Sequence, residues 1–87
     1  MKRRYGVICL DLTPGRSMGV VLNEVFADNE EQAGDVALQI MKKAKGIENC
    51  MLAPALGTAK SIQDYGPATA EELAGWARLC ARYGIEG

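Results

Sequence analysis

Apolar residues near the N-terminus occur in two runs that predict a β-hairpin. Residues 5–12 and 18–26 are rich in β-branched, aromatic and aliphatic side chains, a composition typical of strands. Pro14 and Gly15 lie between the runs and fit the central positions of a type II turn, because proline presets φ and glycine accepts a positive φ. We therefore predict a hairpin over about residues 5–26.

The first of these runs is apolar on both of its faces. Successive side chains of a strand point to opposite sides, so Ile8 and Leu10 face one way while Val7 and Cys9 face the other. Such a strand is covered on both sides, or is covered on one side and engaged with a partner on the other. An open sheet face is therefore a predicted contact surface, including contact between two copies of the chain in a homodimer.

The next segment, about residues 29–45, carries the pattern of an amphipathic helix. Apolar side chains recur with the three- and four-residue spacing of one helical face, at Ala33, Val36, Ala37, Ile40, Met41 and Ala44. Asp28 is expected to cap this helix, with Glu31 in the capping-box position. Gly46 is expected to end it in a left-handed conformation.

A third strand is predicted over about residues 49–56. Pro54 places this strand at a sheet edge or at a strand end, because proline has no N–H to donate. Residues 57–67 lack clear periodicity and are predicted to form a loop, which in a compact domain is often functional when it is this long. A short strand over residues 58–62 is the alternative.

The last element is a helix over about residues 70–83. Thr69 and Glu72 have the spacing of a capping box, and Gly84 supplies the expected stop. The predicted order is thus β-β-α-β-α in one α+β domain of residues 1–87. If the third strand pairs beside the first, the three-stranded sheet is antiparallel with order 2-1-3, and the two helices pack on it.

Composition narrows the class of protein. The 87 residues are 48% apolar and carry a net charge of −1, which suits one small core. No apolar run approaches the ~20 residues that span a bilayer, and the basic start at residues 2–4 is not followed by the apolar region and cleavage site of a secretory signal. We predict a cytoplasmic chain without a membrane segment.

The sequence lacks residue types and motifs that many catalytic and cofactor-binding sites require. The chain has no histidine, and Cys9, Cys50 and Cys80 are too far apart in sequence for a metal or redox pair, so they are interpreted as reduced core residues. Ala59 stands where a phosphate-binding loop that ends in Lys60 and Ser61 needs a glycine. The prediction is a chain that is not an enzyme and that has no cofactor and no metal.

Three groups of charged or polar residues are candidate partner-binding sites. The first is acidic and lies at the start of the predicted first helix, where it either stabilises the helix dipole or docks on a basic partner surface. The second lies in the predicted loop, and the third is an arginine pair on one helical face. These groups are Asp28, Glu30, Glu31 and Asp35; Lys60, Asp64 and Tyr65; and Arg78 and Arg82.

The layout of residues 5–45, a hairpin that leads directly into a helix, resembles that of small phage and mobile-element proteins, among them some anti-CRISPR proteins. The resemblance is one of layout and size. It implies a non-catalytic inhibitor or accessory protein that blocks a surface of a larger complex through protein binding.

Two other functions remain open. The first is an oligomeric domain that binds a small ligand or acts as an enzyme. The second is a nucleic-acid-binding accessory protein, although direct nucleic-acid binding is disfavoured by a pI near 5.3 and by the lack of a recognition motif.

Overall fold

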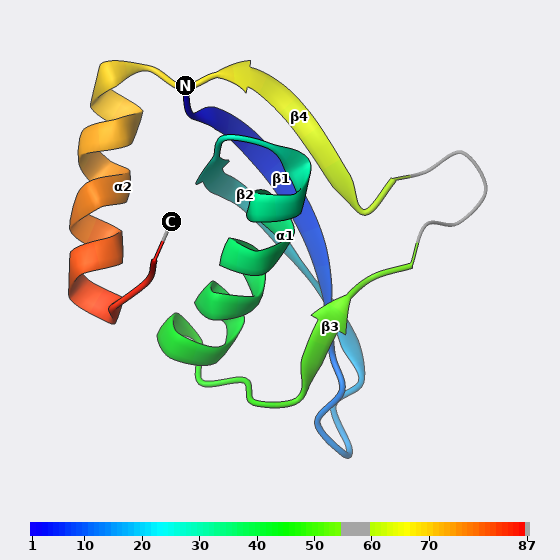
Figure 1. Ribbon diagram of the computed structural model, residues 1–87. Coiled ribbons are helices and arrows are strands. Elements are labelled where there is room, and N and C mark those ends of the chain that lie inside the picture. The colour runs from blue at the N-terminus through cyan, green and yellow to red at the C-terminus, as the bar shows by residue number, and fades with distance from the viewer. Residues whose placement is uncertain (55–59, 87) are drawn as a thin grey trace.

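The computed structural model describes residues 1–54 and 60–86 (Figure 1). It has an α+β fold, as predicted, in which a four-stranded sheet carries the helices. The elements in chain order are β1 (Arg3–Asp11), β2 (Met18–Ala27), α1 (Glu30–Gln39), the π-helical turn η1 (Ile40–Ala44), β3 (Cys50–Leu52), β4 (Ile62–Pro67) and α2 (Ala70–Tyr83).

Strand β1 is the centre of the sheet and pairs antiparallel with each of the other strands. Strand β2 lies along one of its edges, while β3 and β4 occupy successive lengths of the other edge. Ile8 lies where these two lengths meet: its N–H donates to the Ser61 carbonyl (2.8 Å), and its carbonyl accepts from the Ala53 N–H (2.9 Å). The chain therefore leaves the sheet after Ala53 and returns to the same point of β1 at Ser61.

The order β2-β1-β3 agrees with the predicted sheet, but the predicted loop over residues 57–67 is wrong in its second half. Residues 62–67 form β4, and β3 is shorter than the predicted strand over residues 49–56. Residues 55–59, which belong to these two predictions, lie outside the described residues. Strand β4 has no regular alternation of apolar and polar residues. It is held in the sheet by its pairing with β1, and not by its own sequence pattern.

The N-cap of helix α1 lies one residue later than predicted. The Asn29 side chain accepts the Gln32 N–H (2.8 Å), and the Gln32 side chain accepts the Asp28 N–H (2.6 Å), so Asn29 and not Asp28 is the N-cap. The predicted helix over residues 29–45 changes geometry near its end, where η1 has π-helical hydrogen bonds. Gly46 follows with a φ of +69°, the left-handed stop expected from the sequence.

Helix α2 matches its predicted bounds because its end signals are local. Both arms of the capping box form: the Glu72 N–H donates to Thr69 Oγ1 (3.1 Å), and the Thr69 N–H donates to Glu72 Oε1 (2.9 Å). Gly84 ends the helix in the left-handed region. The segment after it returns to the first helix, where the Gln39 side chain exchanges two hydrogen bonds with the Glu86 main chain, each 2.9 Å.

The core lies between one face of the sheet and α1 (Figure 1). On this covered face, Tyr5, Val7 and Cys9 of β1 are buried against the apolar side of the helix. Gly34 lets α1 approach the sheet closely, because a Cβ atom there would lie 2.9 Å from Leu52 Cδ1. Among the described residues, no helix is long and apolar enough to cross a membrane.

Candidate interaction surfaces

The sheet face opposite α1 carries a strip of exposed apolar side chains, which we call the open face. Ile8 of β1 lies opposite Val21 of β2, and Leu10 lies opposite Met51 of β3, so the four side chains adjoin across three strands. Ile8, Val21 and Met51 are 38%, 58% and 44% exposed. In the described chain no helix lies over these four side chains (Figure 1), while α2 packs on Phe26 at the other end of β2.

Tyr65 extends the open face at the other end of β1. It is the extra residue of a β-bulge, since Arg4 lies opposite Gly66 and Tyr5 lies opposite Asp64. Its ring rests over Gly6, where a Cβ atom would be only 2.7 Å from Tyr65 Cε2. The Arg4 guanidinium stacks on the ring at 4.9 Å from the centroid, so this end of the strip is aromatic and basic.

Asp64, a predicted binding residue next to Tyr65, is already engaged within the chain. Arg3 Nε donates to Asp64 Oδ2 (2.8 Å), and the Gly66 N–H donates to Asp64 Oδ1 (2.8 Å). The hydrogen bond from Arg3, followed by that from Gly66, lowers the pKa of the Asp64 carboxyl below its ordinary value. Asp64 thus holds the bulge that presents Tyr65, while Lys60 of the same predicted group is exposed where the chain returns to the sheet.

The predicted acidic group lies at α1, away from the open face. Asp28, Glu30, Glu31 and Asp35 are all exposed. Asp28 is 3.7 Å from the N-terminal ammonium group, and Glu30 and Glu31 lie in the first turn, where negative charge stabilises the helix dipole. Because α1 packs on the covered face, the structure does not bring these carboxylates to the apolar strip.

The predicted arginine pair lies on α2. Arg78 and Arg82 are exposed, and with Leu79 and Tyr83 they line a shallow hollow of about 380 Å³. The Arg82 guanidinium stacks over the Tyr83 ring at 5.4 Å from the centroid. The three predicted groups are therefore on three different parts of the molecule and do not form one site.

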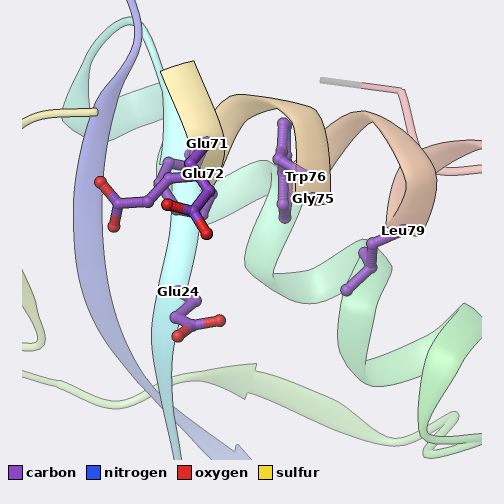
Figure 2. Close-up of a pocket in the computed structure, with 7 residues that line it drawn as sticks. Glu24, Glu71, Glu72, Gly75, Trp76 and Leu79 are labelled. Carbon is purple, nitrogen blue, oxygen red and sulfur yellow. The ribbon is translucent and has the colours of Figure 1, made fainter. Parts of the chain in front are cut away.

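A cleft between β2 and α2 was missed at the level of sequence. It measures about 350 Å³ and is lined by Glu24, Phe26, Glu71, Glu72, Gly75, Trp76 and Leu79. Figure 2 shows Glu71 and Glu72 at the start of α2, near Glu24 of β2, with Trp76 and Leu79 farther along the helix. The spacing of Thr69 and Glu72 indicated a helix start only, and nothing in the sequence paired α2 with Glu24.

The described residues offer little for metal or thiol chemistry. Residues 1–54 and 60–86 contain no cluster of three or more histidine, cysteine or acidic side chains that could hold a metal ion. Burial raises the pKa of Cys9 to about 11 and also raises the pKa of Cys80. Both thiols are therefore protonated at neutral pH, and a protonated thiol is a poor nucleophile.

Comparisons of this chain with known protein families, with curated proteins and with solved structures found no match. Of the surfaces described above, the open face carries the most exposed large apolar side chains.

Proposed function

We propose that this chain is a small, non-catalytic protein-binding module that buries its open face against a partner protein. The observation that carries the proposal is the strip of exposed apolar side chains formed by Ile8, Val21 and Met51, which Tyr65 extends. Burial of apolar surface contributes about 25 cal/mol per Å². Adjoining exposed apolar residues of this kind mark interaction sites more often than isolated ones do.

The shape and charge of the open face favour a protein partner over other ligands. A small molecule binds best in a concave pocket, whereas this face is the surface of a sheet. A nucleic acid needs several cationic side chains, whereas the strip has Arg4 beside Tyr65 at one end, and Glu24 of the neighbouring β2 is acidic. A partner with an apolar patch of its own fits this surface better.

The role that we propose for this binding is inhibition of, or accessory function in, a larger complex. It rests on the layout of residues 5–45 and on the small size of the chain. The raised pKa values of Cys9 and Cys80 argue only against thiol catalysis. A domain of 9.3 kDa that presents an apolar sheet face is large enough to block a site on a larger protein by occupying it.

Photo-crosslinking in cells that naturally express the chain tests this proposal. A photoreactive phenylalanine analogue is placed at Val21 or Met51 of the open face and, as a control, at Asp35 or Ala81, which are exposed on the helices. The proposal predicts that one partner protein crosslinks at both open-face positions and at neither control position. Equal crosslinking at all four positions, or none at Val21 and Met51, would contradict it.

Self-association is measured separately by sedimentation velocity of the purified chain. The proposal of a different partner protein predicts a monomer at micromolar concentration. A stable dimer that the Ile8→Lys substitution converts to a monomer would instead show that two copies pair through the open face, and would overturn the proposal of another protein.

A further inference from the structure

We propose that the cleft between β2 and α2 binds an extended, basic peptide segment of a partner protein, with a lysine or arginine side chain placed among Glu24, Glu71 and Glu72. This site lies along the β2 edge of the sheet; its lining meets the open face at Val21 but does not include Ile8, Met51 or Tyr65. The inference does not depend on the proposed function, since a peptide can enter the cleft whether or not the open face is occupied.

The cleft is part of a longer groove along β2. A second hollow of about 320 Å³ follows the strand from Val21 to Glu24, and its far side is lined by Ile40, Lys45 and Leu79. Both hollows include Glu24 and Leu79, so they adjoin. A groove that follows a strand suits an extended segment better than a compact ligand.

Among the described strands, β2 leaves its outer edge unpaired. Strand β2 is the last strand on its side of the sheet, and no strand in the described ranges pairs with its outer edge. Main-chain groups on an unpaired edge can bond to an added peptide. A bulge interrupts β2, because Asn23 and Glu24 share the position opposite Gly6, and bulges often re-aim side chains next to binding sites.

The negative charge of the cleft favours a cationic occupant. Glu24 and Glu71 are exposed and form no ion pair among the described residues. Glu72 Oε1 accepts the Thr69 N–H of the capping box, and its charge has only a long contact of 3.7 Å with Arg4. Three carboxylates in one cleft repel one another, so a cationic side chain bound among them gains their combined attraction.

The aromatic side of the cleft is consistent with a peptide ligand. Trp76, which is 5% exposed, packs on Phe26 with 5.4 Å between ring centroids. Its buried Nε1 donor has no acceptor in the described part of the chain. A bound peptide brings main-chain carbonyl acceptors, and a guanidinium group also interacts favourably with an aromatic ring.

Titration with a defined peptide tests the site. The probe is a seven-residue peptide of alternating valine and arginine with blocked ends, and the control peptide replaces each arginine with citrulline, which is neutral and similar in shape. Trp76 is the sole tryptophan of the sequence, so its fluorescence reports binding at the cleft. We expect a saturable change with the arginine peptide, at least tenfold weaker binding of the citrulline peptide, and weaker binding at higher salt.

Matched variants show whether the cleft is the site. We expect Glu71→Gln and Glu24→Gln each to weaken binding of the arginine peptide about fivefold or more. Glu48→Gln, which removes the same charge from an exposed position elsewhere, and Ile8→Thr on the open face should leave the affinity unchanged. Absence of a saturable fluorescence change, or equal weakening by Glu48→Gln, would overturn the proposal. A loss confined to Ile8→Thr would also overturn it, because the peptide would then be bound by the open face.

Discussion

The two faces of the sheet are both apolar, yet only one of them is packed. Val7 and Ile8 are neighbours in β1, but Val7 is fully buried under α1 whereas Ile8 is 38% exposed. The same contrast separates the buried Met41 of η1 from the exposed Met51 of β3. Burial in this fold is thus decided by which face the helices take, and the apolar residues left on the other face are available for binding.

The covered face is selected by side chains that fit the helix against the sheet. Gly34 and Ala37 of α1 are small and buried, so the helix can lie close to β1 and β3. The short connection from β2 through Asp28 to the Asn29 cap fixes where the helix begins. Nothing comparable lies over Ile8 and Met51 in the ranges that the structure describes.

The largest difference between the two faces is expected when the same charge is placed on each of them. Val7→Asp buries an uncompensated carboxylate, and we expect it to lower the free energy of unfolding by more than about 4 kcal/mol, enough to unfold a small domain. Ile8→Asp leaves its carboxylate in water and is expected to cost about 1 kcal/mol or less, mainly through strand propensity. Urea unfolding followed by circular dichroism measures both changes.

The pair of variants is its own control, because the residues are adjacent and the substituted side chain is the same. Equal destabilisation by Val7→Asp and Ile8→Asp would mean that the open face is packed in solution, and would contradict the contrast between the faces.

Thiol reactivity gives a second, smaller contrast. Burial, with a lesser contribution from nearby Cys50, raises the pKa of Cys9 from 9.0 to about 11, which lowers its thiolate fraction below pH 9 about 100-fold. We expect Cys9 to resist iodoacetamide at pH 8 in the folded protein, whereas a cysteine introduced by Met51→Cys on the open face reacts readily. Mass spectrometry of the alkylated peptides measures both rates.

The raised pKa of Cys9 also determines how the stability of the fold changes with pH. Because the folded protein holds the Cys9 proton more tightly than the unfolded chain does, this thiol stabilises the fold below about pH 9, and the contribution is lost as the pH rises toward 11. Replacement by Cys9→Ser should remove that loss from the alkaline stability profile. Rapid native alkylation of Cys9 at pH 8 would show that the covered face opens easily.

The smallest expected effect concerns α2, which packs beside β2 through Trp76 and Phe26. A Cβ atom at Gly75 would contact only Arg78 Nη2, at 3.8 Å, so Gly75→Ala should fit and should raise the free energy of unfolding by up to about 1 kcal/mol through helix propensity. Thermal unfolding of the variant checks this. A decrease in stability would mean that α2 packs more closely at Gly75 than the structure shows.

The sequence predicts those parts of the fold whose signals are local. Thr69, Glu72 and Gly84 fix both ends of α2 within a few residues, and the prediction of that helix agrees with the structure. The observed cap of α1 differs from the predicted one by one residue because Asp28 and Asn29 are both good capping residues. With Asn29 as the cap, the Gln32 side chain accepts a hydrogen bond from the Asp28 N–H.

Features that depend on distant partners could not be predicted. Tyr65 belongs to a strand only because β1 accepts it as a bulge over Gly6. The cleft joins Glu24 to Trp76, which are far apart in the chain. The alternation in residues 5–12 indicated two apolar faces, but the choice of the face that stays open depends on the position of α1.

The central claim is that the open face is the surface that binds the partner protein, and the affinity of a crosslinked partner for matched variants tests it most directly. Isothermal titration calorimetry would compare the unaltered chain with Met51→Ala, which changes the open face, and with Glu48→Gln, which does not. We predict that Met51→Ala weakens binding at least about tenfold, a loss equivalent to about 1.4 kcal/mol, while Glu48→Gln binds as the unaltered chain does. An unchanged Kd for Met51→Ala in a folded protein would contradict the claim.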